Sequence, residues 1–470
     1  MQGTGMSNKR ENGKLNPLNG WGWLAGLLTF VLFVYGFGTS QLLGLGAGVI
    51  VCLLLSCNIG GELHYITAAL LGLLLMPGLG LSWVLAVPIV CVVIAALFFR
   101  SNPGVQTMLA SLICILAGLL IGYIVLLLIN PDGAGAAMET ILTNFKSFKK
   151  ESKQISNLGN TLVKTVPLLM CSLSVLFAYK VGLFNIGAAG QYVAGAGLGL
   201  YFAQQFDSPW WVCMIIAMLG GAALGAVSGL LKATRNVNEV ISGIMLNWIC
   251  LYLVNMLLAP YMDIQSNETF SLKMYHPGSM IPPSPILGTF LANPTNGKPH
   301  DYITLALELA LVIAFAIWIL MTRSRLGYEL RATGLNKDAA RYSGMRDRFN
   351  IILTMAIAGG LAGLGAAMFY LTNYMKWPMA VTSVPAMGFN GIAAAFLGGL
   401  HPIGAIFSSF FIQHITDGGS FMEKIYPSEI ASLIAALIIY MCAFVLLLKQ
   451  KIGKIRVPSR TADQKGGETK

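Results

Sequence analysis

The sequence predicts an all-α polytopic membrane protein, and its composition and charge distribution carry this prediction. Of its 470 residues, 56% are hydrophobic and only 10% are charged, with a mean hydropathy of +0.71, whereas soluble domains carry about a quarter charged residues. The charged residues are concentrated in polar stretches between long apolar tracts. At roughly 20 residues per span, these tracts predict about 10 core transmembrane helices plus an N-terminal extension of about 4 further spans. A soluble globular enzyme is excluded.

The N-terminal part of the chain has two predicted sections. Residues 1–20 form a polar tail with several cations, which places it in the cytoplasm by the positive-inside rule. Residues 21–100 hold the extension, in which Glu62 is the sole charge before Arg100. Its breaks suit four short spans, or two spans with re-entrant pieces.

The transmembrane core is expected at residues 106–450, where eight apolar tracts each predict a crossing. These are residues 108–129, 161–179, 182–204, 210–231, 240–259, 303–321, 351–370 and 430–448. The Gly-rich tract 387–413 predicts two short crossings or a re-entrant pair. Stretches 130–160 and 263–301 are expected outside. Stretch 322–350, with seven cations, and the tail 451–470 are expected in the cytoplasm.

Motifs for chemistry on this chain are missing from the sequence. It has no Walker A pattern, no H-E-x-x-H and no G-x-S-x-G, so we expect no catalytic residue, no metal and no bound cofactor. His414 and Asp417 are interpreted as a helix-end pair. The eight cysteines contain no C-x-x-C pair and are expected to be small core residues. The net charge of +11 lies at the ends of apolar tracts, which argues against nucleic-acid binding.

Amide side chains interrupt two of the apolar regions. Phe184, Asn185 and Gln191 belong to the island FNIGAAGQ, and Asn247 lies one to two turns beyond the island RNVNEVIS. Amides at membrane depth either line a watery path or form hydrogen-bonded clasps between helices. Asn238 and Glu239 are better explained as a helix cap.

Two further features could serve either function or structure. Glu308 lies about two turns into a span, where a carboxylate is a functional candidate, but it could also snorkel to the outer surface. Tyr370, Tyr374, Trp377 and Phe389 could stack on a planar ligand. We expect them to form an interfacial aromatic belt instead.

The segment 327–345, GYELRATGLNKDAARYSGM, predicts a short amphipathic basic helix, a small-residue turn and a second short helix. A plain basic loop would satisfy the positive-inside rule equally well. Small residues at a turn with charged flanks suit a helix that docks into a groove of a soluble partner.

Four stretches together resemble the permease subunits of ABC importers for nucleosides and simple sugars, in the superfamily that also contains ribose and branched-chain amino acid permeases. The stretches are GLFNIGAAGQ (182–191), RNVNEVISGIMLNW (235–248), the segment 327–345 and GFNGIAAAFLGGLHPIG (388–404). Their order and spacing agree from residue 108 to about residue 451. The family usually has Glu where Ala189 stands and Asp where Asn390 stands.

The resemblance implies a pore-forming subunit of the bacterial plasma membrane, embedded in lipid, that performs no catalysis itself. It implies three partners: an ABC ATPase subunit that uses ATP, a second permease subunit in a heterodimer, and an extracellular substrate-binding lipoprotein. The implied translocation-path residues are Phe184, Asn185, Gln191, Asn247, Phe389 and Asn390. The implied ATPase-coupling residues are Glu329, Arg331, Gly334, Asn336, Ala339, Ala340 and Gly344.

Nucleosides are the first expected substrates, because FNIG-x-x-GQ and GF-x-GIA look most like the nucleoside branch. A simple sugar of the ribose type is the next candidate. An ion-coupled secondary transporter, with Glu308 and Glu239 as coupling groups, is an alternative of another class, although acid clusters are missing from the spans. A membrane scaffold that uses the basic loop only for docking is a third class.

Overall fold

The computed structural model describes residues 103–291, 300, 302–378 and 381–421, together with scattered residues between 426 and 450. The chain divides into two compact units, residues 1–109 with 456–470, and residues 110–455. The description below concerns the second unit. The predictions for residues 1–20, 21–100 and 451–470 lie outside the described residues.

Helices account for most of the described chain. The α-helices are α5 (Pro103–Ile129), α6 (Pro131–Thr143), α7 (Glu151–Lys180), α8 (Ala188–Phe206), α9 (Trp210–Arg235), α10 (Glu239–Leu258), α11 (Leu272–Tyr275), α12 (Leu287–Phe290), α13 (Ala306–Arg323), α14 (Arg325–Leu335), α15 (Lys337–Tyr342), α16 (Asp347–Tyr370), α17 (Met387–Leu397) and α18 (Pro402–Ser420). The 3₁₀ turns are η3 (Asn144–Ser147), η4 (Ala259–Tyr261) and η5 (Pro277–Ser279). Strands β1 (Met262–Asp263) and β2 (Glu268–Thr269) pair antiparallel, with Met262 opposite Thr269.

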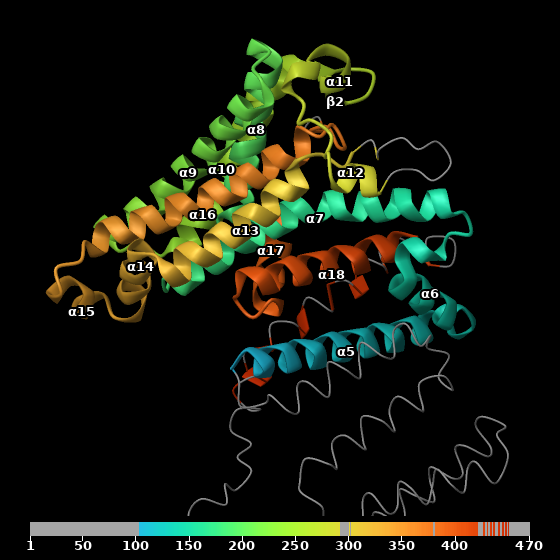
Figure 1. Cartoon of the computed structure of the whole chain (residues 1–470), viewed down its shortest axis with the longest axis horizontal. Coiled ribbons are helices and arrows are strands. Elements are labelled where there is room, and N and C mark those ends of the chain that lie inside the picture. The colour runs from blue at the N-terminus through green and yellow to red at the C-terminus, as the bar shows by residue number, and fades with distance from the viewer. Residues whose placement is uncertain are drawn as a thin grey trace, which may run out of the picture. The chain divides into compact units, whose positions relative to one another are not determined.

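Helices α7 and α16 form the centre of the bundle (Figure 1). The most apolar window of α7 is 89% buried and that of α16 is 72% buried, whereas those of α9, α10 and α13 are 33–39% buried. Apolar helices that are covered on all sides belong in the interior. The exposed apolar faces of the other three suit contact with lipid.

Five of the predicted tracts lie within helices long and apolar enough to cross a membrane, namely α7, α9, α10 with η4, α13 and α16. The protein is therefore a multi-pass membrane protein that is mostly helical. At 30 residues, α7 is about 45 Å long, which exceeds the roughly 30 Å hydrocarbon core. Its polar first turns extend the helix into the stretch 130–160, which also contains α6 and η3.

Helices α9 and α16 cross through glycines that bring their backbones together. A side chain at Gly221 would overlap the Gly359 carbonyl oxygen, and one at Gly225 would overlap the Met355 carbonyl oxygen. Gly363 faces the Ala217 carbonyl oxygen in the same way. Membrane helices pack by such close approach because lipid provides no hydrophobic drive for their association.

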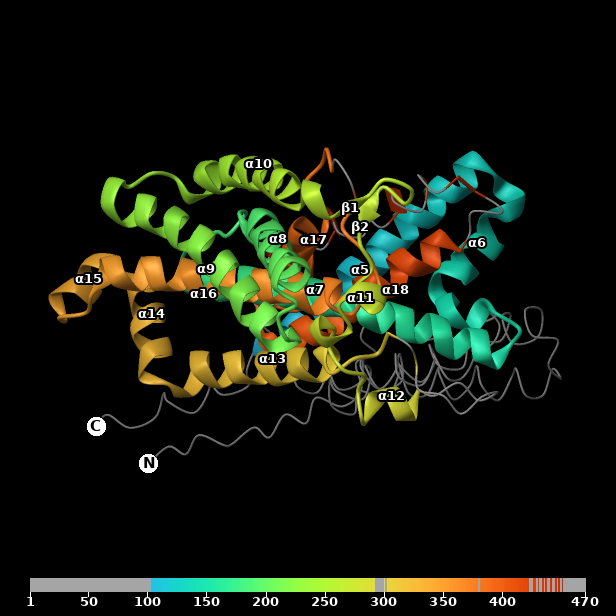
Figure 2. The ribbon, with the colours of Figure 1, turned by 90° about the horizontal axis from the view of Figure 1, so that it is seen from above.

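The Gly-rich tract 387–413 forms α17 and most of α18, joined by a tight turn. Helix α17 has 11 residues and is about 17 Å long, roughly half of the hydrocarbon core. Its length favours the re-entrant interpretation over a separate crossing. Figure 2 places α14 and α15 at one end of the bundle, away from the β1–β2 hairpin and α11.

Candidate translocation and coupling site

Asn185 and Gln191 hydrogen-bond to each other in the break between α7 and α8. The Asn185 Nδ2 atom donates to the Gln191 Oε1 atom at 2.7 Å, and the Gln191 Nε2 atom donates to the Asn185 Oδ1 atom at 3.1 Å. Asn185 Nδ2 also donates to the Ser174 hydroxyl of α7 at 2.9 Å. Both amides are 1% exposed. The pair therefore closes the break onto α7.

Asn247 of α10 caps the beginning of α8 from outside that helix. The N-cap position of α8 is Gly187, which has no side chain to satisfy the free N–H groups of the first turn. Asn247 Oδ1 accepts from the Gly190 N–H at 2.8 Å, and Asn247 Nδ2 donates to the Ile186 carbonyl at 3.2 Å. A Cβ atom at Gly190 would lie 2.6 Å from the Asn247 Oδ1 atom. Gly190 is thus the residue that permits the cap.

We call Asn185, Gln191 and Asn247 the amide clasp. All three are buried, and the bonds above satisfy their amide groups within the chain. The sequence left two interpretations of these amides, a watery path and a hydrogen-bonded clasp between helices. This conformation fits the clasp, since the hydrogen bonds engage all three amide side chains and leave none of them free to line a path. Their assignment as path residues stays a prediction about another conformation.

The remaining path candidates lie at the beginnings of α8 and α17. Gly388 of α17 packs so closely against Ala189 of α8 that a Cβ atom there would lie 2.5 Å from the Ala189 Cβ atom. Phe389, 42% exposed, and Asn390 follow directly on α17. The two positions at which the sequence departs from the resembling family, Ala189 and Asn390, thus lie on helices that touch. Phe184 is half-buried beside the clasp.

The predicted coupling segment consists of two short helices, as the sequence indicated. Ser324 caps α14 by accepting from the Gly327 N–H at 2.9 Å, and Asn336 caps α15 by accepting from the Ala339 N–H at 3.0 Å. Arg325 pairs with Glu329 at 3.0 Å, and Arg331 Nε donates to the Gly327 carbonyl at 3.2 Å. Each of these contacts is local and shapes the two helices.

Apolar side chains project from the two coupling helices. Leu335 is 89% exposed and Tyr342 is 94% exposed, and Ala339 is also exposed. Ala340, in contrast, is buried, and Gly344 takes a left-handed conformation, with φ +81°, that ends the segment. A connector between spans gains nothing from exposing a tyrosine and a leucine in water, so this surface suits a partner.

Gly334 joins the coupling segment to the α7–α8 break. A Cβ atom at Gly334 would overlap the backbone of Val181, and one at Gly182 would lie 2.9 Å from the Gly334 carbonyl oxygen. Gly182 has φ +74°, which an L side chain rarely adopts. Gly334 belongs to the predicted coupling segment and Gly182 to the first sequence motif, and nothing in the sequence indicates that the two residues meet.

Two carboxylates proposed as ion-coupling groups have structural partners. Glu239 pairs with Lys232 at 2.9 Å, across the α9–α10 turn, and Asn238 caps α10 by accepting from the Val240 N–H, which confirms the predicted cap. Glu308 accepts from the Ser284 hydroxyl and from the Leu287 N–H. It lies in the first turn of α13 and holds the loop before that helix, so it is at the end of the helix and not two turns inside it.

Two of the four aromatic residues, Trp377 and Tyr370, are buried, so the belt interpretation fails for them. Trp377 is 1% exposed and Tyr370 is 6% exposed, with ring centroids 5.6 Å apart. Trp377 Nε1 donates to the Asn255 side chain of α10 at 3.2 Å, and its backbone pairs with Thr269. The segment after α16 is thereby fixed to α10 and β2.

Sequence reasoning missed an ion pair between α7 and α18. Lys164 Nζ lies 2.8 Å from the Asp417 Oδ1 atom, and Gln413 Nε2 donates to the same oxygen at 3.0 Å. The helix-end pairing of Asp417 with His414 is therefore wrong, since the His414 Nδ1 atom instead contacts the Asn144 Nδ2 atom at 3.2 Å and its Nε2 atom donates to the Leu142 carbonyl at 3.0 Å. A lysine four residues into the apolar tract 161–179 was the signal that could have found this pair.

The described residues can be searched for metal-ligand groups, reactive cysteines and a ligand-sized pocket. Among the described residues, no group of three or more His, Cys, Asp or Glu side chains could hold a metal ion. Four described cysteines are buried with free thiols, which agrees with their interpretation as core residues: Cys114, Cys171, Cys213 and Cys250.

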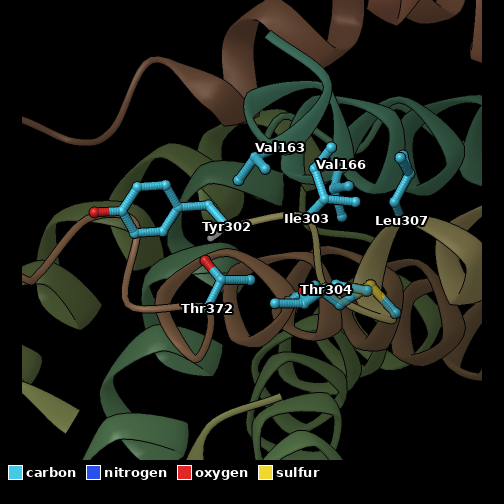
Figure 3. Close-up of a pocket in the computed structure, with 9 residues that line it drawn as sticks. Val163, Val166, Tyr302, Ile303, Thr304, Leu307 and Thr372 are labelled. Carbon is cyan, nitrogen blue, oxygen red and sulfur yellow. The ribbon is translucent and has the colours of Figure 1, made fainter. Parts of the chain in front are cut away.

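Figure 3 shows a pocket between α7 and the segment before α13, lined by Val163, Val166, Tyr302 and Thr372 among others. It holds about one water molecule, too little for a nucleoside or sugar.

Comparison with known proteins identifies relatives of this chain. Residues 157–443 match the family model described as branched-chain amino acid transport system / permease component. A guanosine ABC transporter permease of Bacillus subtilis is 31% identical over 64% of this chain and 85% of its own length. A nucleoside ABC transporter permease of Lactococcus lactis is 29% identical over 78% of this chain and 99% of its own. A glucose ABC transporter permease of Haloferax volcanii is 26% identical over 72% and 88%. No solved structure matches the chain.

Proposed function

Because the chain belongs to the branched-chain amino acid transport system / permease component family, we propose that it is the membrane-spanning permease of an ATP-driven importer of nucleosides. The observation that carries the proposal is the similarity to the guanosine permease, which extends over 85% of that protein. The chain supplies the pore and no covalent chemistry. Its interior helices α7 and α16 and its lipid-facing helices suit that role.

The coupling segment gives the permease a place at which a cytoplasmic ATPase could act. Membership of the family implies an ATPase and a substrate-binding partner in general. In the proposal, the exposed surface of Leu335, Ala339 and Tyr342 docks on the ATPase, which uses ATP. Closure of the ATPase moves α14 and α15 and shifts the population of the spans between inward and outward openings.

The assembly that we propose has two further parts. A second permease subunit completes the pore as a heterodimer, and an extracellular lipoprotein delivers substrate in the bacterial plasma membrane. Both termini of the chain lie in the cytoplasm in this arrangement, on the same side as the coupling segment. These features follow from the family resemblance and from the charge distribution.

Sugars are the second candidate class, and ion coupling is the alternative of another class. The relative from Haloferax is named for glucose, which keeps simple sugars open as substrates. Glu239 pairs with Lys232, and one oxygen of Glu308 holds the loop before α13, so both carboxylates have structural partners, which favours the ATP-driven mechanism over ion coupling.

Uptake by cells tests the substrate class. Cells with and without this chain receive labelled uridine, guanosine or adenosine, with and without excess unlabelled ribose. We expect deletion of the chain to abolish most nucleoside uptake, and ribose to leave the wild-type signal unchanged. Full competition by ribose would transfer the proposal to simple sugars, and uptake that survives deletion would remove nucleosides as substrates.

A further inference from the structure

We propose that Gly334 and Gly182 form the contact through which the coupling segment controls the amide clasp, which makes both glycines positioning residues for transport. The inference rests on the proposed role of residues 327–345 in coupling. It adds a specific route from that segment to the membrane interior, across one backbone contact.

The first part of the route is a contact between two backbones. A Cβ atom at Gly334 would overlap the carbonyl carbon and oxygen of Val181, and one at Gly182 would lie 3.3 Å from the Gly334 Cα atom. Backbone atoms in contact cannot yield by changing a rotamer, as a long side chain could. A displacement of α14 at Gly334 is therefore passed to the turn at residues 181–182.

Helix α14 also contacts α13 and α16, and these contacts limit the directions in which a displaced α14 can move. Thr333, next to Gly334, accepts from the Asn350 Nδ2 atom of α16 at 2.9 Å, and both residues are buried. At the other end of α14, Gly327 lies against the Leu320 carbonyl of α13. The helix is thus held by α13 and α16, and its Gly334 end faces the turn.

The second part of the route is the short chain from the turn to the clasp. Only Leu183 and Phe184 separate Gly182 from Asn185, a span of at most about 10 Å even when extended. The Leu183 N–H bonds the Ala178 carbonyl at 3.0 Å, and the Ile186 N–H bonds the Phe184 carbonyl at 3.2 Å. This segment is too short and too constrained to absorb a shift of the turn.

The clasp converts a shift of that segment into a relative movement of helices. Asn185 bonds both α7, through Ser174, and α8, through Gln191, while Asn247 holds the first turn of α8 and the Ile186 carbonyl from α10. If Asn185 and Ile186 move, these bonds must rearrange together. The clasp is the element with two arrangements, bonded and released, that such coupling requires.

A purely structural role for the glycine contact makes a different prediction from a transmitting role. Packing damage lowers the amount of active complex, so ATP hydrolysis and transport fall in the same proportion. Damage to a transmission contact leaves an ATPase that still turns over but no longer drives the permease. The number of ATP molecules hydrolysed per nucleoside imported separates the two.

The experiment uses the complete complex, with its ATPase and binding protein, reconstituted in liposomes and supplied with labelled guanosine and ATP. The variant is Gly334→Val, and the matched control is Gly135→Val, a helical glycine in α6 whose Cβ position has no neighbour within 4 Å. We expect Gly334→Val to raise the ATP cost per guanosine at least tenfold and Gly135→Val to leave it unchanged. An unchanged cost in Gly334→Val would overturn the proposal.

Three further variants keep the test decisive. Where Gly334→Val does not assemble, Gly334→Ala introduces the same backbone overlap with one carbon and must raise the ATP cost, or the proposal fails. Asn185→Ala should raise it as well, and the double variant Gly334→Ala/Asn185→Ala should be no worse than the stronger single variant, because both act on one route. Multiplied effects would show independent routes and contradict the proposal.

Failure of the proposed function gives a different result. If the wild-type complex imports ribose but no guanosine, the proposed substrate is wrong. The number of ATP molecules hydrolysed per ribose imported then tests the glycine contact in the same way. If the wild-type complex shows no ATP-dependent import of either compound, the function itself is wrong, whatever the variants do.

Discussion

At the scale of single residues, the ion pair of Lys164 and Asp417 is a charged contact inside the described bundle. Lys164 lies four residues into the apolar part of α7, which follows the ten mostly polar residues at the start of the helix, and its side chain is 28% exposed. Its Nζ atom is 2.8 Å from Asp417, whose side chain is 7% exposed, and 5.9 Å from the centroid of the Tyr374 ring. A charge at this depth is tolerable because its partner lies beside it.

Removal of one partner should destabilise the protein more than removal of both. Lys164→Met leaves the Asp417 carboxylate buried with only the Gln413 amide, at an expected cost of about 3–5 kcal/mol in the free energy of unfolding. Lys164→Met/Asp417→Leu should recover most of that loss. Thermal unfolding of the detergent-solubilised variants measures this. Equal thermal unfolding midpoints for the wild type and Lys164→Met would show that the pair is not buried from water.

The amide clasp shows which features of single residues the sequence reveals and which it does not. Asn185, Gln191 and Asn247 stand out in the sequence, since amides in apolar tracts are costly unless paired. Their pairing depends on which atoms α10 brings to the start of α8, and Asn247 lies 56 residues after Gln191. No local pattern contains that information.

At the scale of elements, short helices were predictable where polar periodicity or capping residues mark them. The two coupling helices were recognisable from their basic faces and the small-residue turn. The start of α7 was not, because its first ten residues are polar and suited an external stretch equally well. The interpretation of α17 depends on its length of 11 residues, and only the structure gives that length.

The contact between α9 and α16 should be the most sensitive helix pair in the bundle. Gly225→Ala places a methyl group into the Met355 carbonyl oxygen, so the two helices must separate and much of the interior must shift. We expect a large loss of folded protein, seen by size-exclusion chromatography of the solubilised chain.

Gly360→Ala is the control for that experiment. Gly360 also lies in α16, but the nearest neighbour of a Cβ atom there would be the flexible Met218 side chain, at 3.3 Å, and the Met218 carbonyl oxygen would lie at an ordinary contact distance of 3.5 Å. Its yield should remain close to that of the wild type. A normal yield of Gly225→Ala would mean that the two backbones are farther apart than the structure places them.

At the scale of the whole molecule, composition was enough to predict a polytopic helical membrane protein, because burial in lipid leaves few other choices. Five predicted spans are helices of sufficient length and apolarity. The family resemblance is confirmed by the match over residues 157–443. The connection from Gly334 through Gly182 to the amide clasp could not be predicted, because it depends on contacts between residues about 150 positions apart.

The most direct test of the account is transport by the reconstituted complex with a controlled energy source. Proteoliposomes that contain this chain with its partners receive labelled guanosine, with ATP or with a non-hydrolysable analogue, and with or without a protonophore. The account predicts guanosine accumulation that requires hydrolysable ATP and persists with the protonophore. Accumulation that proceeds without ATP and collapses with the protonophore would contradict it.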